Sequence, residues 1–478
     1  MIDFGTGGFR GVIGETFTKE NIQIITQGIA NIIKKRKSTT PFVVGYDYRF
    51  MSMQAASWVA EVLAGNKIKV ILAKEATPTP AVMYTTKAMN NDFGAMITAS
   101  HNPYYFNGIK VFQKEGMDAD VTLTNEIEDE IRTLKSINKL TIYDKSYKRY
   151  VKTKSILKGY LENIKTFISL DIKGKDSKIL FDAIYGTGAI SLSKIARDYK
   201  LKNFKTIHSK HDAFFGFMLP SPNKENMLKD KALLLKEGFD FALGLDSDGD
   251  RLGMLDELGN YVDSNEILAS IYYYLVKYRG MKGDSVKNCA TSNLLDALSN
   301  KLGFKCHEVD VGFKNISSKI KEVDALIGGE SSGGLTVRNY IYGKDSTFAA
   351  MLFIEMTAIM DKSVSQIIKE VRDFACFHHC IVEDTLSYNE NLNIKEYLYN
   401  NTPKFPTSPK EIRKFGKNVK YIFENNEWAI LRLSGTEPVL RVFVEMETKE
   451  KTEQYLKIMN DFILAIEKEK ISIWISRH

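Results

Sequence analysis

The chain has 478 residues, of which 44% are hydrophobic and 26% charged. This composition is typical of a soluble globular protein, and only 10 prolines exclude collagen-like and proline-rich disordered chains. A chain of this length predicts three or four domains rather than one.

The net charge of +7 comes from 66 Lys and Arg against 59 Asp and Glu. The basic residues are spread along the chain, and no nucleic-acid-binding motif accompanies them. Nucleic acid, an acidic membrane and phosphorylated small molecules are the partners open to a basic protein, and the alternative is a lysine-rich solvated surface, which we favour for most of the lysines. We expect neither nucleic acid nor a membrane as a partner. Four cysteines are too few for a disulfide framework, and the first residues lack the pattern of a signal peptide, so we expect a cytoplasmic protein.

Strands and helices are expected to alternate along most of the chain. The first such stretch has strands at residues 41–47, 68–73 and 94–99 and helices at 52–65 and 79–90. The pattern restarts twice, with strands at 177–182, 241–245, 285–291, 305–311 and 325–328 and helices at 189–199, 294–302 and 313–323. Helices between successive strands favour largely parallel sheets. The apolar run at 347–360 is too short to span a bilayer and predicts a buried helix.

The last hundred residues change character, with expected strands at 419–423, 428–434 and 439–445 before a helix at 449–468. The predicted fold class is therefore α/β, with three similar α/β domains of mixed, largely parallel sheets and a C-terminal α+β domain. We expect the domains to cover residues 1–153, 154–256, 257–373 and 374–478.

A polar hexapeptide, Thr98 to Pro103, directly follows one of these strands. Pro103 disfavours helix at the preceding residue, so Ser100 is expected on a loop at the carboxyl end of a strand, where α/β sheets bind ligands. Ser100 beside His101 suits a nucleophile and its base. The alternative is a polar turn with a capping serine.

Three carboxylates, Asp246, Asp248 and Asp250, follow the apolar run 241–245. They repel one another unless a cation lies between them, and hard oxygen ligands on a tight glycine loop suit Mg²⁺. An EF-hand is excluded because Arg251 occupies the sixth position, where that loop needs glycine. A solvated acidic turn is the weaker alternative, since a strand leads straight into the loop.

Three further stretches carry polar groups beside glycines. Glu330 and Ser332 lie in a glycine-rich stretch that can approach a polyol, although a plain connection has the same pattern. Arg432 precedes Ser434, Gly435 and Thr436 at a strand end, and this combination suits a phosphate group, the alternative being an exposed turn. Arg10 lies in an N-terminal glycine loop that satisfies no nucleotide-binding pattern.

The order of these motifs resembles the signature of the α-D-phosphohexomutase superfamily, in its phosphoglucomutase/phosphomannomutase branch. The resemblance covers essentially the whole chain and implies four domains around a central cleft. They would be, in order, a phosphoserine domain, a Mg²⁺-binding domain, a sugar-binding domain and a phosphate-binding domain.

The resemblance also implies roles for individual residues. Ser100 would be the phosphoserine, and its phosphoryl oxygen would hold Mg²⁺ together with Asp246, Asp248 and Asp250. The sugar would be bound by Glu330 and Ser332, near Lys344 and Asp345. The non-transferred phosphate would be held by Arg432, Ser434, Gly435 and Thr436. Charge and proton handling around the phosphoserine would fall to Arg10, His101, Lys110 and Arg251, with His101 or Lys110 as the base.

The implied activity is a mutase that interconverts hexose 1-phosphate and hexose 6-phosphate, with glucose, mannose or both as the sugar. A bisphosphorylated sugar would be the intermediate, hexose 1,6-bisphosphate would be the activator, and the enzyme would be a monomer or homodimer. The alternatives are a phosphoglucosamine mutase, from whose usual sugar loop Ser331 and Gly334 depart, an inactive sugar-phosphate-binding protein, and a Mg²⁺-dependent phosphatase.

Overall fold

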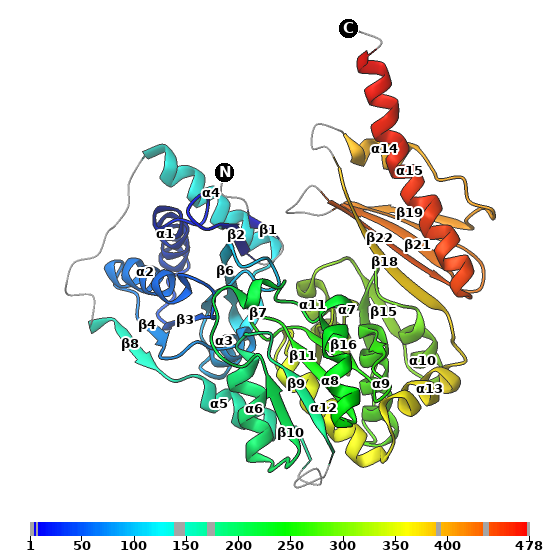
Figure 1. Cartoon of the computed structure of the whole chain (residues 1–478). Coiled ribbons are helices and arrows are strands. Elements are labelled where there is room, and N and C mark those ends of the chain that lie inside the picture. The colour runs from blue at the N-terminus through cyan, green and yellow to red at the C-terminus, as the bar shows by residue number, and fades with distance from the viewer. Residues whose placement is uncertain are drawn as a thin grey trace.

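The computed structural model describes residues 4–5, 8–137, 149–169, 177–388, 393–433 and 439–475. Four sheets follow one another along the chain, from the blue N-terminal sheet to the orange and red C-terminal one (Figure 1). The first three sheets are mixed and the fourth is antiparallel, which confirms the predicted fold class.

The first sheet has the order β1-β2-β6-β5-β3-β4-β8, with β7 beside β6. Strands β5, β3, β4 and β8 are parallel, and β2 and β6 are antiparallel to their neighbours. The strands are β1 (Phe4–Gly5), β2 (Gly8–Val12), β3 (Phe42–Tyr46), β4 (Val70–Ala73), β5 (Phe93–Ile97), β6 (Phe106–Gln113), β7 (Met117–Asp118) and β8 (Val151–Lys154). The helices are α1 (Lys19–Lys35), α2 (Ser52–Gly65), α3 (Thr79–Ala88) and α4 (Val121–Ile137). Both β3 and β5 are buried along their whole length, as expected for strands covered on both faces.

The second sheet has the order β10-β9-β11-β12-β13, and its first three strands are parallel. Its strands are β9 (Ile179–Asp182), β10 (Phe204–Ile207), β11 (Phe241–Leu245), β12 (Leu252–Leu255) and β13 (Tyr261–Val262). The helices in this part of the chain are α5 (Leu157–Lys165), α6 (Gly188–Asp198), α7 (Lys224–Met227) and α8 (Lys231–Glu237). Because β13 pairs with β12, this sheet continues past the boundary expected at residue 256.

The third sheet has the order β15-β14-β16-β17, with only β17 antiparallel. Its strands are β14 (Ser285–Asn288), β15 (Cys306–Val309), β16 (Ile327–Gly329) and β17 (Leu335–Val337). Its helices are α9 (Ser264–Lys277), α10 (Leu294–Leu302), α11 (Phe313–Val323), α12 (Ser346–Met360) and α13 (Val364–Ala375). Helix α12 is the apolar helix expected at 347–360, and nearly all of it is buried.

The fourth sheet has the order β18-β22-β21-β20-β19 and is antiparallel throughout. Its strands are β18 (Cys380–Ser387), β19 (Glu411–Phe415), β20 (Asn418–Ile422), β21 (Trp428–Leu433) and β22 (Val439–Met446). Its helices are α14 (Ile394–Asn400) and α15 (Lys449–Ile475), which runs further than the expected 449–468. Figure 1 shows α15 crossing one side of this sheet and projecting beyond it.

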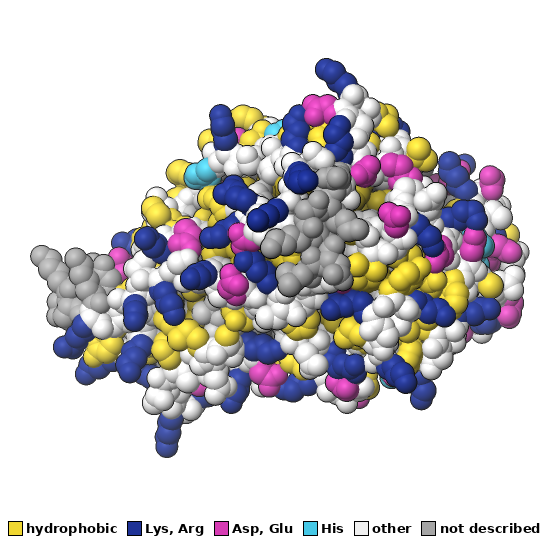
Figure 2. All heavy atoms as spheres, turned by 90° about the horizontal axis from the view of Figure 1, so that it is seen from below, with side chains coloured by type: hydrophobic (Ala, Val, Ile, Leu, Met, Phe, Trp, Pro, Cys, Tyr) yellow, Lys and Arg dark blue, Asp and Glu magenta, His cyan; other side chains and the backbone are white. Residues whose placement is uncertain are grey.

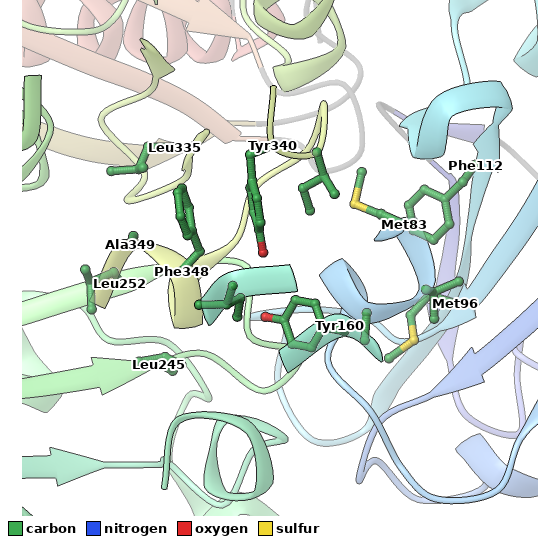
Figure 3. Close-up of a cluster of buried hydrophobic side chains, with 14 of the residues drawn as sticks. Met83, Met96, Phe112, Tyr160, Leu245, Leu252, Leu335, Tyr340, Phe348 and Ala349 are labelled. Atoms are coloured by element: carbon green, nitrogen blue, oxygen red, sulfur yellow. The ribbon is translucent and has the colours of Figure 1, made fainter. Parts of the chain in front are cut away.

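One hydrophobic core is shared by the first three sheets and their helices. Its middle joins Met83 of α3, Tyr160 of α5 and Phe348 of α12 (Figure 3). The Tyr340 ring stacks on Phe348 with centroids 3.9 Å apart. The fourth sheet and α15 enclose a separate core that includes Tyr421 and Tyr455. A smaller apolar cluster, in which Cys289 and Ala290 meet Trp428, Ile430 and Phe443, joins the third and fourth sheets.

The surface carries mixed charge. Lys and Arg side chains are interspersed with Asp and Glu over the face in Figure 2 and do not gather in one place. Among the described residues, no helix has both the length and the apolar character needed to cross a membrane.

A charged side chain lies inside the shared core. Glu355 of α12 is fully buried, and its carboxylate accepts hydrogen bonds from the Tyr274 hydroxyl and from the Ser169 amide at 2.5 Å. Arg279 lies 3.6 Å from the same carboxylate. The carboxylate is therefore the shared acceptor for donors from three segments of the chain.

We expect Glu355→Leu to destabilise the protein by about 2–4 kcal/mol, because it removes the buried carboxylate that the Tyr274 hydroxyl, the Ser169 amide and Arg279 share. The urea midpoint of unfolding measures this loss. Glu322→Leu on α11 is the control, since the Glu322 side chain is 63% exposed and only pairs with Lys319 at the surface. It should change stability by about 0.5 kcal/mol or less. Equal midpoints for the two variants would contradict the prediction.

Candidate active site

The acidic loop after β11 is anchored from three sides. Gly249 has a φ of 69°, a left-handed conformation that glycine adopts without strain and that lets the loop turn tightly. Backbone amides from three parts of the chain donate to its carbonyl groups: Thr79 to Asp248 at 2.8 Å, Thr187 to Ser247 at 2.9 Å and Ser346 to Gly249 at 3.2 Å. The loop therefore has a fixed shape only where the first three domains meet.

The three predicted metal ligands lie together on this loop. Asp246, Asp248 and Asp250 are at most 2% exposed, and each offers an oxygen within 4.8 Å of the others. Burial raises the pKa of Asp246, and the neighbouring Asp250 and Asp248 raise it further. Among the described residues, Asp248 Oδ1 and Asp250 Oδ1 have no hydrogen-bond partner although both are buried. Buried oxygens that lack partners fit a hard divalent cation, so the loop is a possible metal site.

Two lysines balance part of this negative charge. Lys110 Nζ lies 2.7 Å from Oδ2 of both Asp248 and Asp250, and Lys344 Nζ lies 3.5 Å from Asp250 Oδ2. Burial alone would raise the pKa of Asp250, but Lys110, Lys344 and Arg251 hold it well below its usual value. Burial likewise acts to lower the pKa of Lys110, yet the two carboxylates keep it above its usual value. The charges are thus strongly coupled, as is common at functional sites.

Ser100 points at the acidic loop. It lies on the loop after β5, is 1% exposed, and donates from Oγ to Asp246 Oδ2 at 3.0 Å. Its φ of 49° is left-handed, which costs a residue other than glycine about 1–3 kcal/mol. The Ser100 amide donates to Thr98 Oγ1 at 2.8 Å, and Ser247 Oγ donates to the Ser100 carbonyl at 2.5 Å. The surroundings therefore hold the serine in an unfavourable conformation that aims its hydroxyl at Asp246.

His101 and Arg10 lie beside Ser100 at one wall of a cleft of about 540 Å³. Burial, together with the positive charges of Arg251 and Arg10, holds the pKa of His101 well below its usual value. Its ring is therefore neutral at neutral pH. Arg10 Nη1 donates to Asn102 Oδ1 at 2.6 Å, which ties β2 to the serine loop.

The same cleft receives Glu330, Ser332 and Lys344 from the third domain. Glu330 accepts from Ser332 Oγ at 2.8 Å and from Asn288 Nδ2 at 3.1 Å, which leaves its carboxylate oriented by two side chains. A Cβ atom at Gly334 would lie 2.1 Å from Lys344 Cδ. A side chain at position 334 would therefore force the lysine that reaches Asp250 and Glu330 to move.

The fourth domain contributes two guanidinium groups to the cleft, Arg432 and Arg441. They lie directly opposite each other on β21 and β22, and Arg441 also pairs with Glu383 at 2.8 Å. Burial lowers the pKa of Arg432, and the neighbouring Arg441 lowers it further. Two cations held side by side suit an anion such as phosphate. The other predicted phosphate ligands, Ser434, Gly435 and Thr436, lie outside the described residues.

Asp345, which the resemblance places near the sugar, does not line the cleft. Its carboxylate accepts from the Phe348 amide at 2.9 Å, so it caps α12, and from the hydroxyls of Tyr160 at 2.8 Å and Tyr340 at 2.5 Å. Burial raises its pKa to about 6. It is fully buried behind the cleft rather than on its lining, and the structure assigns it these three contacts. Contact between Asp345 and a sugar stays a prediction.

The cleft also contains polar residues that the motifs did not predict, among them Asn288, Asp118 and Arg441. The sequence carried one usable signal, because Arg441 interrupts the apolar run Val439–Val444 on a strand. The positions of Asn288 and Asp118 depend on how strands from distant parts of the chain pack together. No local pattern marks them.

The chain matches four family descriptions in succession. They are Phosphoglucomutase/phosphomannomutase, alpha/beta/alpha domain I over residues 1–138, domain II over 158–259, domain III over 263–374, and the C-terminal domain over 400–461. Together these matches cover most of the sequence, in the order expected for a four-domain protein.

Individual relatives match over nearly their whole length. A phosphoglucomutase/phosphomannomutase of Thermococcus kodakarensis is 28% identical over 95% of this chain and 97% of its own. A phosphoglucosamine/phosphogalactosamine mutase of Sulfurisphaera tokodaii is 26% identical over 92% of this chain and 94% of its own. The crystal structure of a Thermus thermophilus protein assigned as a phosphomannomutase has a TM-score of 0.84 and 26% identity, and covers 97% of this chain and 99% of its own.

We expect Mg²⁺ to raise the thermal unfolding midpoint of the protein, because a cation bound by the three carboxylates stabilises the folded state. Asp248→Asn should remove most of this shift, since it replaces a charged ligand with an amide. Asp361→Asn is the matched control, because Asp361 is exposed at the end of α12. A Mg²⁺-dependent shift that is equal in the two variants would place the cation elsewhere.

Proposed function

Because the chain belongs to the phosphoglucomutase/phosphomannomutase family of phosphohexomutases, we propose that it interconverts the 1- and 6-phosphates of glucose, of mannose or of both through a phosphoserine at Ser100. The observation that carries the proposal is the hydrogen bond from Ser100 Oγ to Asp246 within a buried acidic loop. A serine hydroxyl that faces three carboxylates and two lysines suits phosphoryl transfer, which depends on positioning and charge neutralisation.

The proposed cation is Mg²⁺, held by Asp246, Asp248, Asp250 and a phosphoryl oxygen on Ser100. When bound, it would neutralise charge on the transferred phosphate. Arg10 and Arg251 line the same wall of the cleft and would add positive charge there. His101 and Lys110 are the two proposed proton acceptors for the attacking sugar hydroxyl. His101 is the better candidate, because its ring is neutral whereas the carboxylates favour the charged form of Lys110.

The rest of the cleft suits a sugar bisphosphate that reverses its orientation between two half-reactions. Glu330 would accept hydrogen bonds from the sugar hydroxyls, and Ser332 would accept from them or donate to them. Arg432, with Ser434, Gly435 and Thr436, would hold the phosphate that is not being transferred, and we add Arg441 to this group. The proposed domains are those expected from the sequence, with the second extended to Val262 because β13 completes its sheet.

Phosphoglucosamine mutase is the second candidate. The relative from Sulfurisphaera tokodaii carries that activity in its name, and a carboxylate such as Glu330 accepts hydrogen bonds from an ammonium group as well as from a hydroxyl. A coupled assay with glucose 1-phosphate, mannose 1-phosphate and glucosamine 1-phosphate separates the candidates, with glucose 1,6-bisphosphate as activator. A higher kcat/KM for glucosamine 1-phosphate would overturn our choice of sugar.

We expect Ser100→Ala to lower kcat by at least about 10⁴-fold, because the phosphate carrier is lost. Intact mass after incubation with glucose 1,6-bisphosphate should show one phosphate on the wild-type chain and none on the variant. Ser57→Ala is the control, since Ser57 is on the exposed side of α2 and bonds only to its own helix. Turnover by Ser100→Ala at the wild-type rate would refute the phosphoserine.

We expect Arg441→Ala to raise KM about tenfold or more while kcat changes less, because the lost guanidinium contacts a phosphate that stays bound throughout. Arg432→Ala should also raise KM with a smaller change in kcat. The double variant should lose less binding free energy than the sum of the two single variants, since both groups hold one anion. Steady-state kinetics with glucose 1-phosphate measures both parameters. An unchanged KM in both single variants would exclude these arginines from substrate binding.

A further inference from the structure

Arg49 is a buried arginine that no motif singled out. It lies in the turn after β3 and is 3% exposed. Its guanidinium donates to four backbone carbonyls, three on the loop between β5 and β6 and one at the start of β6. Nη1 donates to Pro103 at 2.8 Å and to Phe106 at 3.0 Å, and Nη2 donates to Asn102 at 2.5 Å and to Ser100. One side chain thus ties together the whole loop that carries Ser100.

Arg49 is itself held from behind by Asp47, which is 2% exposed. Asp47 Oδ2 lies 3.5 Å from Arg49 Nε and accepts from Thr98 Oγ1 at 2.7 Å. Thr98 Oγ1 in turn accepts from the Ser100 amide at 2.8 Å. The Ser100 amide is therefore held by a hydrogen bond to Thr98, and the Ser100 carbonyl by a hydrogen bond from Arg49. Both Thr98 and Arg49 in turn contact the carboxylate of Asp47.

The second domain covers this arrangement. The ring of Phe215 lies 5.0 Å from Arg49 Cζ, and Phe215 is fully buried with a left-handed φ of 51°. His211, from the same segment, has its Nε2 3.0 Å from the Tyr48 carbonyl. An aromatic ring over a guanidinium excludes water and adds a cation–π attraction. Hydrogen bonds from the guanidinium to the serine loop are stronger in such a dry setting.

We propose that Arg49, sealed by Phe215, is a positioning residue that holds Ser100 in its left-handed conformation with Oγ aimed at the acidic loop. The proposal rests on the proposed phosphoserine role of Ser100. In the proposed mechanism Ser100 Oγ gives up the phosphate in one half-reaction and takes it back in the other. The serine loop must therefore keep its shape whether or not Ser100 is phosphorylated. The fork of an arginine can serve four carbonyls at once, whereas a lysine presents one nitrogen. Burial lowers the pKa of Arg49 to about 10, so the cation persists at neutral pH.

The test compares two variants with matched controls. Arg49→Lys keeps the charge and loses the fork, and Arg132→Lys is its control at an exposed ion pair on α4. Phe215→Leu leaves Arg49 in place and removes the ring, and Phe217→Leu is its control, since Phe217 is 75% exposed in the same segment. Each kcat is expressed per glucose 1-phosphate binding site, counted by calorimetric titration, so that unfolded protein does not contribute.

We expect Arg49→Lys to lower kcat per site about 100-fold and Phe215→Leu about tenfold, with KM within about threefold of wild type, because misplacement of a reacting group by about 1 Å has effects of this size. Both controls should stay within about twofold. A wild-type kcat per site in either Arg49→Lys or Phe215→Leu overturns the proposal, and Phe215→Leu decides it if Arg49→Lys does not fold. Ser100→Ala separates failure of the proposed phosphoserine from failure of the proposed positioning role of Arg49. If that variant turns over normally, the phosphoserine is wrong; if it is inactive while Arg49→Lys is normal, only the role of Arg49 is wrong.

Discussion

Three carboxylates are buried within 4.8 Å of one another at the end of one strand, and the rest of the molecule has to compensate for their charge. No single domain does so. Lys110 comes from the first domain and Lys344 from the third, and both reach Asp250. A buried charge that is not paired is costly, so the acidic loop favours the state in which these domains are assembled around it. Assembly of the first three domains and formation of the acidic site are in this sense one event.

In its described residues, the fourth domain does not take part in neutralising the acidic loop. Its core is separate, and its contribution to the cleft is positive charge from Arg432 and Arg441 rather than a share in the acidic loop. It joins the third domain through a small apolar cluster, in which Trp428 and Phe443 meet Cys289, and through polar contacts such as Lys420 to Glu308 at 2.7 Å. This apolar cluster is smaller than the core that the first three domains share.

Much of the fold could be predicted because strong local patterns mark it. The runs at 52–65, 241–245, 294–302 and 313–323 coincide with α2, β11, α10 and α11, and Asp246 follows its strand as expected. Strand β6 escaped prediction because Asn107, Gly108 and Lys110 break its apolar alternation. The position of Arg49 under Phe215 could not be predicted, since it depends on two domains meeting. The cap that Asp345 forms on α12 is a local contact with the Phe348 amide, whereas its hydrogen bond from Tyr160 was hidden because Tyr160 lies far away in the sequence.

The shared core also bears on how the chain reaches its folded state as it leaves the ribosome. Tyr160 and Asp345 are separated by 185 residues, yet their hydrogen bond lies in the middle of that core. At about 5–20 residues per second, synthesis takes roughly 10–40 s to supply the second partner. During this interval the apolar faces of α3 and α5 lack the cover that Tyr340 and Phe348 later provide. These apolar faces of the nascent chain therefore stay uncovered until helix α12 has been synthesised.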